Sequence, residues 1–205
     1  MGVVLCLIGG LSNYLLNHRS KAVEKNRYFS LIFITLALSS LGSAVAAITE
    51  AYGAGKYDVT IFVAKIFTIA GGYWYFALYN KYLTTSISLK KNKAKVWNMI
   101  FFSLTIAMSI LLLCNIFGRY LYTVENGKYI LGKAFWLTGS FEIAVLIADL
   151  VLLIYCSKHI NKRDLFVHLI CILFPIAMAT AQIAYGKIHF LDAAIIIVAI
   201  VMLLH

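Results

Sequence analysis

The sequence is poor in charged residues and contains one proline. Of its 205 residues 13% are charged, whereas 62% are hydrophobic. An ordinary soluble domain carries roughly a quarter charged residues. A water-soluble fold of this size has too little interior to bury so much apolar surface. The composition therefore excludes a soluble globular domain and predicts helices that lie in a lipid bilayer.

The chain also lacks the motifs of common enzymes. It contains no GxSxG, no HExxH, no phosphate-binding loop and no paired carboxylates in a polar loop. Its cysteines lie inside apolar runs without metal-site or redox-pair spacing, and free cysteine is commonly a buried packing residue. We expect no catalytic residue, metal site or cofactor, so the chain as given is not an enzyme. The cysteines are Cys6, Cys114, Cys156 and Cys171.

Long apolar runs, separated by short polar segments, occupy most of the chain. A membrane-spanning helix needs about 20 mostly apolar residues, and the first and last runs are the shortest. The sequence predicts an all-α polytopic integral membrane bundle of seven transmembrane helices, forming a single domain over residues 1–205. The predicted spans are 2–16, 28–49, 59–83, 96–117, 135–155, 165–185 and 190–204.

The basic residues indicate how the helices cross the membrane. Twelve Lys and Arg residues lie in segments 17–27, 81–95 and 158–163, against five in the loops on the other side. Cytoplasmic loops carry the excess of Lys and Arg, so the N-terminus is predicted outside and the C-terminus in the cytoplasm. The net charge of +10 forms no continuous patch, and we expect no nucleic-acid partner.

A β-hairpin is predicted in the longest outer loop, at about 120–132. The segment 122–130 reads Tyr-Thr-Val-Glu-Asn-Gly-Lys-Tyr-Ile. Asn-Gly favours a two-residue type I′ turn, and the flanking residues favour strands. The positive-inside rule makes this hairpin extracellular.

Small residues and the single proline have structural and functional interpretations. Small residues in the second span, among them Ser39, Gly42 and Ala46, allow close helix approach. We favour packing inside the bundle over a dimer seam.

Pro175 lies midway along the sixth span and should kink it, because proline removes an intrahelical hydrogen bond. The functional interpretation, as an alternative to a purely structural kink, is that Pro175 forms a hinge that moves in signalling.

Ionisable residues within spans are costly and tend to face the bundle interior. Lys65 and Glu142 are predicted at similar depth, where an ion pair can form, with Gln182 and Asp192 nearby. Asp149 is predicted near mid-membrane beside the aromatic 73–75 cluster. A ligand pocket and an internal hydrogen-bond network remain alternatives for each residue. The candidate ligand-binding residues are Lys65, Tyr73, Trp74, Glu142, Asp149, Gln182 and Asp192. His168 lies a few residues from the inner face, and the alternative for this residue is that it reaches water there.

Short aromatic and turn motifs resemble a known family. They resemble the N-terminal seven-transmembrane sensor region of bacterial (Firmicute-type) GGDEF diguanylate cyclases, and the related histidine kinase sensor region is the nearest alternative. The motifs are Asn26-Arg27-Tyr28-Phe29, Tyr79-Asn80-Lys81-Tyr82-Leu83, the hairpin segment 122–129 before Phe135-Trp136, and Phe174-Pro175.

The resemblance implies a sensor or receptor in the bacterial cytoplasmic membrane. Such a module perceives an extracellular or membrane-borne signal and relays it through the last helix. The chain has no GGDEF motif or kinase core, so we expect a separate or missing cytoplasmic output domain, and a homodimer. The main alternative is a small multi-span transporter or channel, in which the buried charges form a translocation path. A purely structural subunit is a third interpretation.

Overall fold

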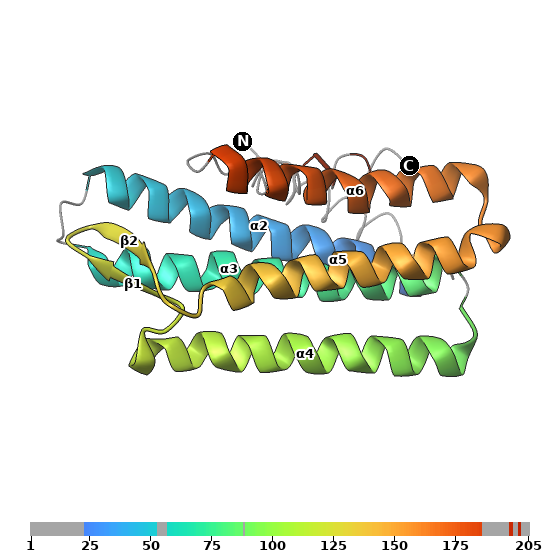
Figure 1. The fold of residues 1–205 in the computed structure, drawn as a ribbon, viewed down its shortest axis with the longest axis horizontal. Coiled ribbons are helices and arrows are strands. Elements are labelled where there is room, and N and C mark those ends of the chain that lie inside the picture. Colours follow the sequence, from blue (N-terminus) through green and yellow to red (C-terminus); the bar gives the residue numbers. More distant parts are fainter. Residues whose placement is uncertain (1–22, 53–56, 88, 186–196, 199–200, 202–205) are drawn as a thin grey trace.

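The computed structural model describes residues 23–52, 57–87, 89–185, 197–198 and 201. Within these ranges, five long helices lie alongside one another and a two-stranded hairpin lies at one end, here called the hairpin end (Figure 1). The elements are α2 (Val23–Tyr52), α3 (Asp58–Ser86), α4 (Lys91–Gly118), β1 (Tyr122–Glu125), β2 (Lys128–Leu131), α5 (Trp136–Cys156), the short 3-10 helix η1 (Ser157–His159) and α6 (Lys162–Tyr185).

Four of the described helices are long and apolar enough to cross a membrane. They are Arg27–Tyr52 within α2, Asp58–Ser86, Lys91–Gly118 and Trp136–Cys156. This finding supports a helical membrane protein. The predicted sixth span, 165–185, lies within α6. The predicted first and last spans lie outside the described residues, except for the helical positions 197–198 and 201.

The surface of α4 fits a lipid environment. Large apolar side chains stay exposed along its whole length, from Met99 to Ile110 and Phe117, which are 58%, 56% and 91% exposed. In water such a surface would be unfavourable, whereas lipid tails are as apolar as the side chains themselves. The helix therefore needs little contact with the rest of the chain.

The closest helix pair is α2 with α3. Ser39 Oγ donates a hydrogen bond to Thr68 O at 2.9 Å. A Cβ added at Gly71 would lie 2.6 Å from Ser39 Cβ, so glycine is needed for this approach. Small residues let helix backbones come together. The predicted packing role of the small residues in the second span is confirmed, with α3 as the partner helix.

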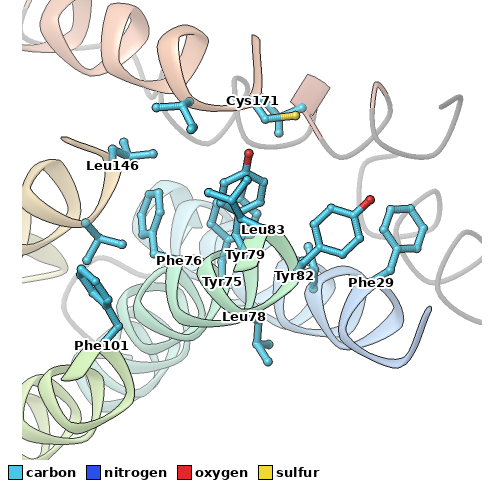
Figure 2. Packing of buried hydrophobic residues seen from close by; sticks show 14 of the residues in the cluster. Phe29, Tyr75, Phe76, Leu78, Tyr79, Tyr82, Leu83, Phe101, Leu146 and Cys171 are labelled. Atoms are coloured by element: carbon cyan, nitrogen blue, oxygen red, sulfur yellow. The ribbon is translucent and has the colours of Figure 1, made fainter. Parts of the chain in front are cut away.

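Helix α3 is the centre of the bundle. The largest core cluster includes its residues Tyr75, Phe76 and Tyr79, all of which are nearly inaccessible. Figure 2 shows these side chains together with Phe29 of α2 and Cys171 of α6, and the cluster also includes residues of α4 and α5. A helix that is apolar on all faces is one surrounded by neighbours. The position of α3 therefore follows from its aromatic residues.

The predicted hairpin is confirmed. Glu125 pairs with Lys128, which leaves Asn126 and Gly127 as a two-residue turn. Their φ angles of 54° and 75° are both positive, as a type I′ turn requires, and Asn-Gly accepts that conformation readily. The two strands span 122–131, within the predicted limits.

Pro175 lies inside α6, which continues as one helix from Lys162 to Tyr185. Proline in a helix interior leaves one carbonyl without its usual amide partner, and neighbouring groups in a membrane bundle can compensate. The helix therefore passes through the proline, and the hinge role of Pro175 stays a prediction.

Gly42→Ala is expected to destabilise the bundle. A Cβ at Gly42 would lie 2.6 Å from Ala64 O, and a backbone oxygen cannot rotate away. Overpacking of this kind costs about 1–3 kcal/mol, so thermal unfolding in detergent should show a lower Tm. Gly139→Ala is the matched control, because a Cβ there meets nothing within 4 Å. Equal losses of Tm in the two variants would contradict the close contact.

Candidate functional site

A charged cluster of Glu50, Lys65 and Tyr129 lies at the hairpin end. Lys65 Nζ is 3.7 Å from Glu50 Oε1 of α2 and 4.7 Å from the centre of the Tyr129 ring of β2. The Lys65 side chain is only 12% exposed. Ion-pair and cation–π contacts strengthen as water is removed, so this cluster, called here the Lys65 cluster, ties α2, α3 and the hairpin together.

The hairpin is further bound to α3. The Gly127 amide in the turn donates to Asp58 Oδ1 at 2.7 Å, and the Tyr122 hydroxyl donates to Phe62 O at 3.0 Å. Burial raises the pKa of Tyr129 well above the ordinary tyrosine value, and the nearby Tyr122 hydroxyl and Glu50 carboxylate act in the same direction. The hairpin is therefore packed on the helices as part of the fold.

Asn115 near the end of α4 positions the entry into the hairpin. It is 1% exposed; its Oδ1 accepts from Leu121 N at 2.7 Å, and its Nδ2 donates to Tyr122 O at 3.0 Å. Sequence reasoning missed this residue. The only available signal was an asparagine near the end of an apolar run, just before a predicted hairpin.

Glu142 lies farther from the hairpin end than the backbone of Lys65, whose Nζ pairs with Glu50, and the ion pair of Lys65 with Glu142 stays a prediction. The Glu142 carboxylate lies beside Gly72 of α3, since a Cβ added at Gly72 would lie 3.3 Å from Glu142 Oε1. Gly72 follows Lys65 by seven residues, or about 10 Å of helix. The reason is that α5 begins farther along the bundle than α3, because the hairpin covers the end of α3 first (Figure 1).

Tyr73 lies at the level of Glu142 and joins α3 to α5. Its ring is fully buried and meets Phe141 of α5 edge-on, with ring centres 5.3 Å apart. Its hydroxyl has no hydrogen-bond partner among the residues that the structure describes. Trp74 instead contacts Phe102 of α4, at 6.2 Å between ring centres. The two neighbouring aromatic residues therefore face different helices.

Asp149 of α5 is fully buried beside Asn80 of α3, and these two residues are called here the Asp149 pair. Asn80 Nδ2 donates to Asp149 Oδ1 at 2.5 Å. Asp149 Oδ2 and Asn80 Oδ1 have no hydrogen-bond partner in the described part of the chain. Since Asn80 follows Tyr73 by seven residues, the pair lies about 10 Å beyond Tyr73 and Trp74. Asp149 therefore lies farther along α3 than Tyr73 and Trp74, and the pocket of Asp149 with the 73–75 aromatic cluster stays a prediction.

His168 of α6 joins α6 to the same part of α3. It is 5% exposed, and its Nδ1 lies 3.3 Å from the Tyr79 hydroxyl. The alternative that His168 reaches water is wrong, because α6 packs this face of its helix against the α3 aromatic residues. Gln182 lies in α6, but its side chain is outside what the structure describes, and Asp192 lies outside the described residues.

No protein-family model, curated protein or solved structure matches this chain. The fold and composition support the class of helical membrane proteins with several spans. The resemblance to sensor regions of diguanylate cyclases and histidine kinases stays a prediction, and so does ligand binding by the seven candidate residues.

Asp149→Asn is expected to keep or raise stability, and Asp149→Ala to lower it. Asparagine still accepts the Asn80 hydrogen bond and carries no charge, whereas alanine leaves the buried Asn80 amide unpaired, at a cost of about 1–3 kcal/mol. Thermal unfolding of the purified variants measures both effects. Equal destabilisation by the two substitutions would show that the Asn80 contact contributes nothing.

The hairpin is expected to lose stability at alkaline pH. A folded-state pKa raised above the unfolded value of about 10 means that the contribution of Tyr129 is complete below that pH and is lost as pH rises further. Tyr129→Phe keeps the ring over Lys65 and removes the titrating hydroxyl. Circular dichroism and phenolate absorbance should show a smaller alkaline loss in this variant; an unchanged loss would contradict the assignment.

Proposed function

We propose that the chain is a membrane-embedded sensor or receptor module of the bacterial cytoplasmic membrane. It perceives an extracellular or membrane-borne signal and relays it through the last helix to a cytoplasmic output domain, such as a diguanylate cyclase. In this proposal the bundle has seven spans, the N-terminus and hairpin lie outside, and the module works as a homodimer with its output. The basic segments 17–27, 81–95 and 158–163 support that orientation.

The observation that carries the proposal is that α3 holds contacts at both ends of the bundle. At the hairpin end it binds the hairpin through Asp58, Phe62 and Lys65. Toward its other end it contacts α5 through Asn80 and α6 through Tyr79. A displacement of the hairpin therefore acts on the same rigid helix that holds α5 and α6.

The mechanism is a shift between two packings of the bundle. A ligand changes such an equilibrium only by binding one packing more tightly than the other. Two groups of residues are the candidate input contacts. One is the Lys65 cluster, and the other is Glu142 with Tyr73 and Phe141 at the same level of the bundle. Both combine a charge with aromatic rings. Movement of α6 about Pro175 would pass the change to the last span.

A transporter or channel is the second candidate. The observation that favours it is the buried Asp149 carboxylate, whose Oδ2 lacks a partner among the described residues, because intramembrane carboxylates mark ion and proton pathways. Ion or solute flux through the purified protein in liposomes distinguishes the two functions. Flux that Asp149→Asn abolishes would replace the sensor proposal with a transporter.

Releasing the hairpin from α3 is expected to change amide hydrogen exchange at the far end of α3 in the full chain. Asp58→Ala removes the acceptor of the Gly127 amide. If α3 transmits the change, amide hydrogen exchange in lipid nanodiscs should rise in the hairpin and also change in 79–86 and 162–168. Lys128→Ala, an exposed hairpin residue, is the control and should leave both segments unchanged. A change confined to the hairpin in Asp58→Ala would contradict the sensor mechanism.

A further inference from the structure

A groove of about 530 Å³ separates α3 from α4 at the end opposite the hairpin. It runs along α4 from Lys91 to Phe102, which corresponds to about 16 Å of helix. Its polarity changes along this length. The lysines lie near the start of α4, whereas Met99 and Phe102 provide an apolar floor farther along.

Lysine side chains make the groove positively charged. Lys81, Lys91 and Lys95 line it, and no acidic side chain is among the described residues that do. The two α4 lysines are exposed, so their side chains are free to reach an anion. Lys90 lies next to Lys91 in the sequence, whereas Lys93 Nζ lies 5.7 Å from the centre of the Tyr155 ring of α5. Clustered lysines raise the local positive potential and attract anions.

A buried polar atom in the groove lacks a partner. Asn98 is 6% exposed and lines the groove. Its Oδ1 lies 3.1 Å from Thr84 Oγ1, whereas its Nδ2 has no hydrogen-bond partner among the described residues. An unpaired buried amide costs about 1–3 kcal/mol. Because this amide is inaccessible here, a ligand oxygen in the groove would satisfy it only after a small shift of the neighbouring lining side chains.

We propose that the α3–α4 groove binds the phosphate headgroup of an anionic phospholipid. The lysines and the Asn98 amide would receive the phosphate oxygens, and an acyl chain would lie on Met99 and Phe102. The location agrees with this ligand, because both helices are candidate membrane spans and their ends lie where headgroups do. Basic pockets between transmembrane helices are known to bind such headgroups. The proposal needs only the membrane location of the helices and is independent of the sensor function.

Native mass spectrometry of the full chain in detergent micelles tests the proposal. The probes are phosphatidylglycerol, phosphatidylcholine and inorganic phosphate. We expect phosphatidylglycerol to bind more tightly than either of the others. Removing lysines near a headgroup weakens binding by about fivefold each, so Lys91→Ala with Lys95→Ala should weaken it roughly 25-fold. The matched control, Lys128→Ala with Lys133→Ala, removes the same charge at the hairpin end and should change binding little.

Asn98→Asp tests the buried amide separately. Aspartate has the shape of asparagine and still accepts from Thr84, but it replaces the donor with a negative charge. It should weaken phosphatidylglycerol binding at least tenfold with phosphatidylcholine binding unchanged. If this variant fails to fold, the exposed Lys91 and Lys95 pair still tests the charged part of the proposal.

Three results would overturn the proposal. Equal binding of phosphatidylcholine would show that the lysines do not select the headgroup. Equal losses in the two double-lysine variants would show attraction by overall charge. Binding of inorganic phosphate as tight as that of phosphatidylglycerol would define a site for a free anion and remove the role of the acyl chain.

Discussion

The close contact between α2 and α3 determines how the rest of the structure is arranged. Between two helices in lipid there is no hydrophobic driving force, so close packing and interhelical hydrogen bonds must hold them. Gly42 and Gly71 remove the side chains that would keep the helices apart, and the Ser39 hydroxyl bonds across the gap. This contact fixes the register of the two helices. It thereby brings Glu50, in the last turn of α2, beside Lys65, two turns into α3.

With α2 fixed on one side, α3 becomes the helix to which the other elements attach. Its aromatic residues fill the space toward α5 and α6, and its polar residues occupy distinct levels along the bundle axis. Lys65, Tyr73 and Asn80 follow one another at intervals of seven or eight residues, so they lie on nearly the same face of the helix. Lys65 meets α2 and β2, whereas Tyr73 and Asn80 both meet α5 at different levels. The buried polar groups therefore form separate contacts instead of one continuous chain.

The sequence predicted those features that depend on local chemistry. Asn-Gly specifies the hairpin turn, the apolar runs specify helices, and the small residues of the second span specify a close helix contact. Depth within the bundle was harder to predict. Counting from helix starts placed Lys65 and Glu142 at one level, but the starts of α3 and α5 are offset by the hairpin that folds over the end of α3. The same offset separates Asp149 from Tyr73.

Partners across helices were the other part that the sequence could not provide. Asn80 was visible only as part of a family-like motif, and Asn115 only as an asparagine near the end of an apolar run, yet both make buried hydrogen bonds that position neighbouring elements. A lone amide in an apolar run has the same appearance whether it faces lipid, a cofactor or another helix. Its role depends on register between segments far apart in the chain, and register is set by packing.

The distribution of charge then separates the two ends of the bundle. Lys65 is neutralised within the chain, since Glu50 and the Tyr129 ring both lie against it. The lysines of the α3–α4 groove have no acidic residue beside them among the described lining residues. An uncompensated positive potential at the end of a membrane span attracts whatever anions lie at that depth. In a bilayer those are the headgroups, because no other anion is held at that level by its own apolar chains.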